Sequence, residues 1–151
     1  MVHRIHSKGP YTHEEYEAGE AGIYPGMLVK LMNDNTVDLH DAAGGRAEAM
    51  FAEEDALQGK TVDDVYAAGA VCSVILPGLG CEVNARIQND QDLAIGDRVI
   101  SAGDGTLMAL GTLDSENVDY HVIGVMMEAI DLTGSEASTE RLARVRITAG
   151  N

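Results

Sequence analysis

Residues 93–110, with the sequence LAIGDRVISAGDGTLMAL, carry the clearest structural signal in the chain. Two short apolar runs, at residues 99–100 and 106–110, flank the connection Gly103-Asp104-Gly105. Glycine adopts positive φ without strain, so this connection favours a hairpin of two short strands. The stretch contains no nucleophile and no paired acid and base. It therefore predicts a β-scaffold, and the function must be sought in the protein's surface and assembly.

The same alternation of short apolar runs and turns continues on both sides of this hairpin. Residues 23–26 (IYPG) and 33–35 (NDN) have turn compositions, and residues 77–78 (PG) end the strongest apolar run. Gly124 interrupts a long apolar segment, which is typical of a bulge. The pattern predicts nine or ten strands, including residues 27–32, 36–40, 70–76, 82–87, 120–130 and 142–147. We expect an all-β fold, either a compact antiparallel β-barrel or a β-sandwich.

Length and composition agree with one small β-domain. The chain has 151 residues, which predicts a single domain, and 45% of them are hydrophobic. It has one Phe and no Trp, so aliphatic side chains must build the core. Seventeen glycines against three prolines favour many tight turns between short strands.

Residues 1–20 differ in composition from the remainder, residues 21–151, where we place the folded domain. Residues 1–13 contain three histidines and no acid, whereas residues 14–20 contain four glutamates. Apolar residues are sparse, so we expect an extended N-terminal arm that adds little to the core and is ordered only against a neighbour. The histidines lack a matching cysteine or carboxylate pattern, so we predict no metal site here.

Residues 53–66 are the most acidic part of the predicted domain. Glu53-Glu54-Asp55 and Asp63-Asp64 do not have the spacing of a calcium loop, which favours a solvated acidic loop over a cation site. Residues 61–66 are expected to open a short helix, with Thr61 as its N-cap and Asp64 as the acid of a capping box. His40 alternates with apolar residues, and we expect it to face solvent.

The formal net charge of −15 argues against nucleic-acid binding. It serves either solubility alone or docking on a complementary basic surface. The sequence has no signal-peptide pattern and no apolar run of membrane-spanning length, so export and membrane insertion are not expected. In a hairpin of residues 70–76 and 82–87, Cys72 and Cys81 would not face each other. We predict free thiols, in keeping with synthesis in the cytoplasm.

Catalytic signatures are not found in the sequence. Ser73 and Ser101 have no histidine nearby in sequence, and the chain lacks a nucleophile elbow, a P-loop and a Cys-x-x-Cys motif. We therefore predict no enzyme activity, no catalytic residue, no metal and no cofactor. One alternative is a trimeric nucleotide hydrolase of the dUTPase kind, because residues 61–69 (TVDDVYAAG) resemble the uracil-binding motif of those enzymes. The Pro-Arg-Ser-Gly segment and the glycine-rich C-terminal tail of that family are missing.

The order of motifs resembles the capsid decoration, or cement, proteins of tailed bacteriophages. The resemblance runs over residues 22–148 through IYPGMLVKL, MFAEED, GKTVDDVYAAG, VILPGLGCEVNARI, IGDRVISAGDGTL, VIGVMMEAIDLTG and RVRIT. It implies a non-enzymatic β-barrel or tulip-like domain on the capsid exterior of a virion, made in the host cytoplasm. Such a protein binds the major capsid protein, bridges its subunits and commonly forms a homotrimer.

Two groups of residues follow from this interpretation as candidate contacts. The arm would lie on the capsid shell through Val2, Arg4, Ile5, His6, Lys8, Tyr11 and Tyr16. The basic cluster of Arg141, Arg144 and Arg146 would meet an acidic face of the same molecule or of a neighbouring subunit. A further alternative is the base module of a head fibre or receptor-binding protein, which would occupy a few sites rather than the whole head.

Overall fold

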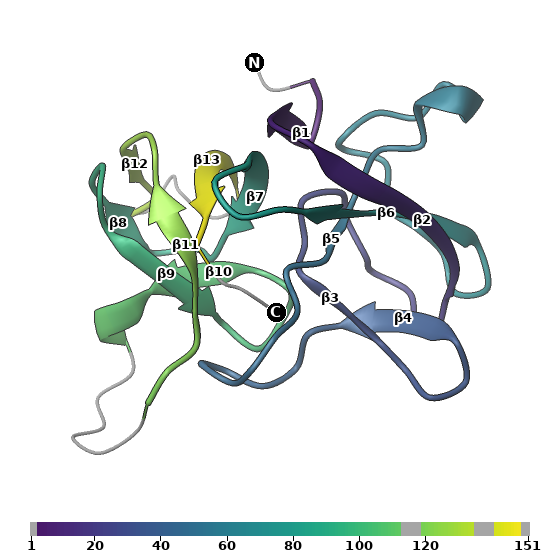
Figure 1. Ribbon diagram of the computed structural model, residues 1–151, viewed down its shortest axis with the longest axis horizontal. Coiled ribbons are helices and arrows are strands. Elements are labelled where there is room, and N and C mark those ends of the chain that lie inside the picture. Colours follow the sequence, from purple (N-terminus) through teal and green to yellow (C-terminus); the bar gives the residue numbers. More distant parts are fainter. Residues whose placement is uncertain (1–2, 113–118, 135–140, 149–151) are drawn as a thin grey trace.

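The computed structural model describes residues 3–112, 119–134 and 141–148 and is built almost wholly from β-strands (Figure 1). Within these ranges there are thirteen strands and two short 3-10 helices, which confirms the all-β prediction. No helix among them is long and apolar enough to cross a membrane. The strands are β1 (His6–Lys8), β2 (Tyr11–Ala18), β3 (Val29–Leu31), β4 (Thr36–Leu39), β5 (Phe51–Ala52), β6 (Val71–Pro77), β7 (Glu82–Ile87), β8 (Asp92–Leu93), β9 (Arg98–Ser101), β10 (Leu107–Ala109), β11 (Val122–Met126), β12 (Ile130–Asp131) and β13 (Arg141–Ile147). The 3-10 helices are η1 (Ala56–Gln58) and η2 (Leu110–Thr112).

Five strands from the second half of the chain close into a barrel, on the left in Figure 1. Their order is β7-β10-β9-β11-β13, and β13 pairs with β7 to complete the circle. All neighbours are antiparallel except β7 and β10. The predicted hairpin is β9 and β10, with Leu107 opposite Ser101, and both Gly103 and Gly105 have positive φ. The barrel prediction is confirmed.

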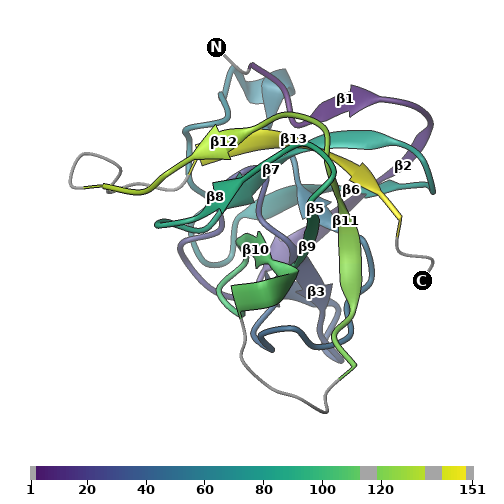
Figure 2. The ribbon, with the colours of Figure 1, turned by 90° about the vertical axis from the view of Figure 1, so that its left-hand side faces the viewer.

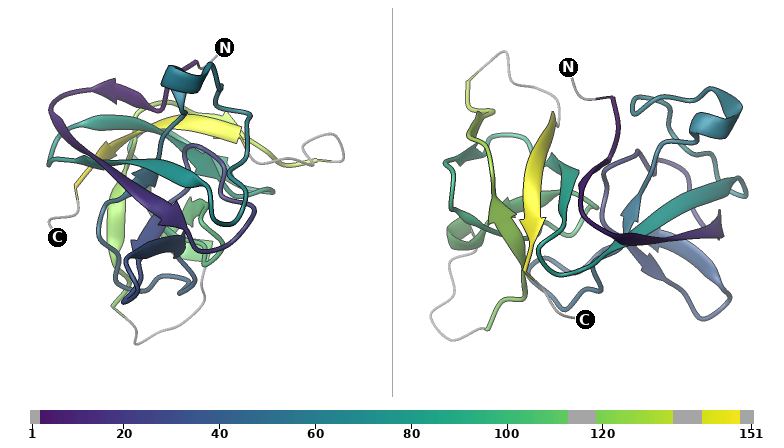
Figure 3. Two further views of the ribbon diagram at one scale, coloured as in Figure 1. Left: turned by 90° about the vertical axis from the view of Figure 1, so that its right-hand side faces the viewer. Right: turned by 45° about the horizontal axis from the view of Figure 1, so that its top comes forward.

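The first half of the chain contributes most of a second sheet, in the order β3-β4-β2-β6-β5. It lies beside the barrel, on the right in Figure 1 and in the right-hand view of Figure 3. Strand β2 is central in this sheet, because it is hydrogen-bonded to β6 along seven residue pairs and to β4 on its other edge. A β-strand in such a position has both rows of backbone groups engaged, so the sheet cannot form without it.

Two apolar clusters hold these parts together. The larger one fills the barrel with Val83, Ile87 and Ile123 and extends to Phe51 and Ile75 of the second sheet. The smaller one lies on the other side of that sheet and contains Ile23, Val29, Val37, Met50, Ala52, Tyr66, Cys72 and Val74. Because alternate residues of a strand point to opposite faces, Val74 and Ile75 place β6 in both clusters.

Strands β8 and β12 form a separate two-stranded ribbon beside the barrel (Figure 2). Leu93 of β8 and Leu132, which follows β12, are buried in the larger cluster. The ribbon therefore covers part of the barrel core.

Two glycines show how the local sequence sets the backbone. Gly26 has φ +89° in the predicted Pro-Gly turn, where the Met27 N–H donates to the Tyr24 carbonyl at 3.1 Å. Gly124 lies at the predicted bulge, where the register between β11 and β9 shifts. A Cβ at Gly124 would come within 2.5 Å of the Arg146 carbonyl oxygen, so the strands approach each other too closely for any side chain there.

Two expectations about the middle of the chain are wrong. Strands β6 and β7 do not pair as the hairpin considered for Cys72 and Cys81: β6 joins β2 and β5, whereas β7 joins the barrel. Strand β7 is mostly buried. Residues 61–66 form a turn instead of a helix, although the hydrogen bond expected from a capping box is present, with the Thr61 N–H donating to Asp64 Oδ2 at 2.7 Å.

The N-terminal segment is integrated with the rest of the molecule. Residues 6–8 and 11–18 are strands of the two large sheets, and Ile5 is fully buried in the larger cluster. The expectation that this segment adds little to the core is therefore wrong at Ile5, and also at Ala18, which is buried in the smaller cluster. Strand pairing with β7 and β6 integrates this segment, which its sparse apolar composition did not indicate.

Candidate docking surface

The N-terminal segment is held in place by hydrogen bonds from both backbone groups of Ile5. The Ile5 N–H donates to Glu54 Oε2 at 3.0 Å, and the Ile5 carbonyl accepts from the Asn84 N–H at 2.8 Å. The Asn84 side-chain amide also donates to the Arg4 carbonyl at 2.8 Å. The backbone of Arg4 is therefore fixed, while its side chain remains 71% exposed.

Strand β7 brings the N-terminal segment and the last strand together. Strand β1 pairs with one edge of β7 and β13 pairs with the other, as the right-hand view of Figure 3 shows. In this register Lys8 and Arg146 both lie opposite Glu82. The Glu82 carboxylate is 3.1 Å from Arg144 Nε and 3.9 Å from Lys8 Nζ. Part of each predicted contact group thus comes together: Lys8 from the N-terminal group and Arg144 and Arg146 from the basic cluster lie around Glu82.

We call this region the basic surface, defined by Arg4, Lys8, Arg144 and Arg146. It contains a depression of about 410 Å³, lined by His3, Arg4, His6, Ser7, Asn84, Glu128 and Arg144. Its acids are already engaged: Glu128 Oε1 accepts from the Arg144 N–H at 2.6 Å, and Glu54 Oε1 lies 3.6 Å from Arg4 Nε. The surface thus contains four cationic side chains, and three of them pair with its own carboxylates, in a molecule whose net charge is −15.

The remaining predicted contact residues are placed as follows. Val2 lies outside the described residues. Ile5 is buried and offers no surface to a partner. His6 hydrogen-bonds the Gly9 carbonyl and its ring lies 4.2 Å from that of Tyr11, which is 39% exposed. Tyr16 packs against the smaller cluster. Arg141 and Arg146 are exposed on β13.

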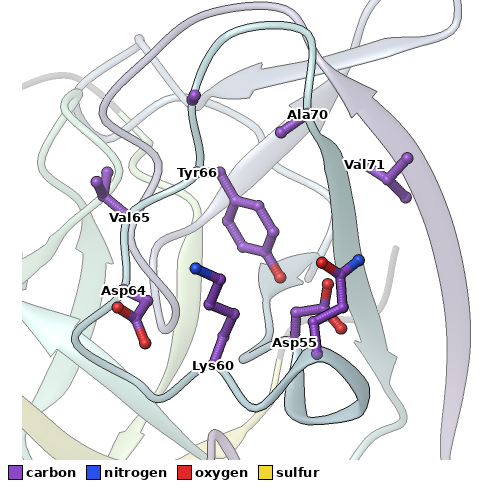
Figure 4. A pocket seen from close by; sticks show the side chains of 9 residues that line it. Asp55, Lys60, Asp64, Val65, Tyr66, Ala70 and Val71 are labelled. Atoms are coloured by element: carbon purple, nitrogen blue, oxygen red, sulfur yellow. The ribbon is translucent and has the colours of Figure 1, made fainter.

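A second hollow lies on the segment that resembles the nucleotide hydrolases (Figure 4). It has a volume of about 380 Å³ and is lined by Asp55, Gln58, Lys60, Asp64, Val65, Tyr66, Ala67, Ala70 and Val71. The Tyr66 hydroxyl donates to the Glu53 carbonyl at 2.6 Å and accepts from the Ser73 N–H at 3.3 Å. The hydrogen bonds from the Thr61 N–H and hydroxyl lower the pKa of Asp64. These polar groups serve the local fold.

Two serine–histidine contacts connect residues distant in sequence, which sequence reasoning missed. His13 Nε2 lies 2.6 Å from Ser73 Oγ, and the Ser73 hydroxyl donates to Glu53 Oε2 at 3.3 Å. The same histidine nitrogen is 3.7 Å from Glu53, so the carboxylate does not orient the ring through its second nitrogen as in a hydrolase triad. Ser73 Oγ therefore lies within hydrogen-bond distance of both His13 and Glu53.

His40 is buried rather than solvent-facing. Its Nε2 lies 2.8 Å from the Arg46 carbonyl and therefore carries the proton, so Nδ1 accepts from the Ser101 hydroxyl at 2.6 Å. Ser101 Oγ in turn accepts from the Gly103 N–H at 3.2 Å. This histidine joins the end of β4 to β9, and its environment is that of a structural contact between the second sheet and the barrel.

The acidic stretch is only partly solvated, which corrects the expectation for Glu53 and Glu54. Both are buried, whereas Asp63 and Asp64 are exposed. Burial and the neighbouring Glu54 carboxylate raise the pKa of Glu53. Among the described residues no group of His, Cys, Asp or Glu is arranged to hold a metal ion.

Cys72 and Cys81 are free, as predicted, and both are buried. Burial raises the pKa of the Cys72 thiol to about 12, which keeps it protonated and unreactive at neutral pH. The Cys81 thiol lies 3.0 Å from the Pro10 carbonyl, next to the turn that joins β1 and β2. Both cysteines therefore serve packing.

The fold of this chain is similar to that of a bacteriophage head fiber protein. The solved structure is that of the head fiber gp8.5 N base in bacteriophage phi29. The two have a TM-score of 0.55 at 14% sequence identity, over 92% of this chain and 95% of that chain. No protein-family model and no curated protein matches the sequence. The similarity establishes the fold of this chain. It does not show whether the chain belongs to the narrower family of capsid cement proteins.

Proposed function

We propose that this protein is a structural component of the exterior of a bacteriophage head. The observation that carries the proposal is the fold shared with the phi29 head fiber base over nearly the full length of both chains. The sequence resemblance to phage decoration proteins indicates the same class of protein by an independent route. A structural role also fits the serine, histidine and tyrosine contacts described above, which are used within the fold.

In this proposal the basic surface faces the major capsid protein. Arg4, Lys8, Arg144 and Arg146 lie on it, and His6 and Tyr11 adjoin it, whereas Ile5 anchors the segment from within. Each contact of this kind is weak in water because exposed ion pairs are worth about 1 kcal/mol or less. A homotrimer that bridges capsid subunits would multiply such contacts into stable attachment.

A second form of the same function is the base of a head fibre, and the phi29 similarity favours it specifically. The two forms differ in where the protein sits. A decoration protein occupies equivalent sites over the whole shell, whereas a fibre base occupies a limited set of sites and carries a further structure outward. Both act by binding.

Co-sedimentation with heads assembled without this protein tests the proposal. We expect saturable binding, and electron microscopy of the decorated heads then distinguishes uniform coverage from a few occupied sites. Folded protein that leaves the heads undecorated at every ratio would refute the proposal. Turnover of any member of a nucleoside triphosphate panel would instead support the hydrolase alternative. Removal of residues 2–20 is not a usable test, because it deletes β2 from the centre of its sheet.

A further inference from the structure

A row of three side chains crosses the outer face of the barrel. Val125 of β11 lies opposite Arg98 of β9 on one side and opposite Arg146 of β13 on the other. Residues paired across neighbouring strands point to the same face, and Val99 and Val145, which adjoin the two arginines in sequence, are buried in the barrel core. The arginines therefore point outward, and both are exposed. We call these three residues the arginine row.

The two charges of the arginine row are not neutralised from within. Neither Arg98 nor Arg146 has an ion-pair partner among the described residues. Arg144, by contrast, is held by Glu82 at 3.1 Å. The carboxylate of Asp97, next to Arg98, accepts from the Ala94 N–H at 2.8 Å. The row is thus a fixed surface feature with two unpaired positive charges.

The second sheet carries a feature of opposite charge. Glu15 and Glu17 project from the same face of β2, and Glu17 lies opposite Val71 of β6. Both glutamates are exposed, and Val71 is 58% exposed. In the part of the chain that the structure describes, neither glutamate takes part in an ion pair. We call Glu15 and Glu17 the glutamate pair.

The two features match in charge and in composition. Each has two like charges next to a valine that is at least partly exposed. They belong to different parts of the molecule, the barrel and the sheet beside it (Figure 1). The arginines lie about two strand spacings apart, roughly 10 Å, and the glutamates two residues apart, roughly 7 Å, a difference that the long arginine side chains can span.

A second copy of this chain supplies the partner that each feature lacks. Two molecules of net charge −15 repel each other in most orientations, so association is favoured only where opposite charges meet. The arginine row and the glutamate pair provide that orientation, and the contact between them also covers Val125 and Val71.

We infer that copies of this chain associate head to tail, the arginine row of one copy binding the glutamate pair of the next. Because the two sides of this contact differ, the assembly ends only when it closes into a ring. Each copy in a ring makes two such contacts, so exposed ion pairs worth about 1 kcal/mol or less add up. The size of the ring rests on the proposed function, in which it is the homotrimer. Arg146 then serves the contact between copies.

The mass of the intact protein in solution, measured by light scattering after size exclusion, tests this inference. We expect the mass of three chains. The double variants Arg98→Glu/Arg146→Glu and Glu15→Lys/Glu17→Lys should each have the mass of one chain, because like charges then face each other. The fourfold variant reverses both sides of the contact and should regain the mass of three chains.

Arg141→Glu and Glu14→Lys are the matched controls. Arg141 is exposed on the same strand as Arg146, and Glu14 is exposed on β2 but points to the face opposite the glutamate pair. Both controls should keep the mass of three chains, and a cooperative urea transition verifies that each variant is folded. An unmodified protein with the mass of one chain, dissociation of the controls, or a fourfold variant that stays dissociated would each overturn the inference.

Head binding separates this inference from the proposed function. An unmodified protein that has the mass of one chain and still decorates heads would refute the inference and leave the head-surface role intact. A protein that assembles through this contact but leaves heads undecorated would refute the role and leave the contact intact.

Discussion

The burial of Ile5 makes a quantitative prediction about the N-terminal segment. Ile5→Ala removes about three methylene equivalents from a side chain with no exposed area, and at roughly 0.8 kcal/mol each this costs about 2.4 kcal/mol. The space left behind adds to the cost, because the surrounding barrel residues relax only in part, and measured losses for such changes range from about 2 to 5 kcal/mol.

Urea denaturation measures this loss. With a slope of about 2 kcal/mol per M, the unfolding midpoint should fall by more than about 1 M. Ile95→Ala is the matched control, because Ile95 is 69% exposed and the same atoms are removed. Its midpoint should stay within the equivalent of about 0.5 kcal/mol. Equal midpoints for the two variants would refute the conclusion that Ile5 is part of the core. They would instead support the original expectation of an N-terminal arm that adds little to the core.

Three further outcomes are expected. Burial raises the pKa of Glu53, so the folded state holds this proton more tightly than the unfolded chain does, and the stability that Glu53 contributes is present below its ordinary pKa of 4.5 and is lost as the pH rises above it. Urea titrations should therefore show that Glu53→Gln gains stability relative to the unmodified protein between pH 4 and pH 7. A difference in stability that stays constant over this range would contradict this. Gly124→Ala should destabilise the protein by about 1 to 3 kcal/mol in thermal melts, because its Cβ would meet the Arg146 carbonyl, whereas Gly111→Ala, which meets nothing within 4 Å, should not. A thiol reagent at pH 8 should label neither Cys72 nor Cys81 in the folded protein and both in denaturant, and rapid labelling without denaturant would contradict their burial.

Local chemistry in the sequence predicted individual strands and turns well. The Gly-Asp-Gly hairpin, the Pro-Gly turn at Gly26, the bulge at Gly124 and the alternation in β13 all depend on neighbouring residues, and all are present. Strand partners were harder to predict, because short strands of similar composition can pair in many ways. Strands β6 and β7 are close in sequence and turn away from each other into different sheets.

For the candidate docking surface, too, the local features could be predicted and their arrangement in space could not. Its basic residues were identified as two separate groups, but nothing in the sequence indicated that β7 would bring them together. His40 is a similar case: alternation placed it on one face of β4, yet only the tertiary fold decides that Ser101 and Arg46 cover that face. Ile5 was underestimated because a single apolar residue leaves no periodic signal.

The position of β7 between β1 and β13 has a consequence for folding. Its partners come from nearly opposite ends of the sequence, so each pairing closes a long loop: Val83 is 77 residues from His6 (83 − 6), and Arg146 is 64 residues from Glu82 (146 − 82). Contacts of this kind slow folding, because chain entropy is lost before the pairing returns any stability. During synthesis β7 leaves the ribosome long before β13 and keeps an unpaired edge until then, so the nascent chain is most prone to aggregation in that interval.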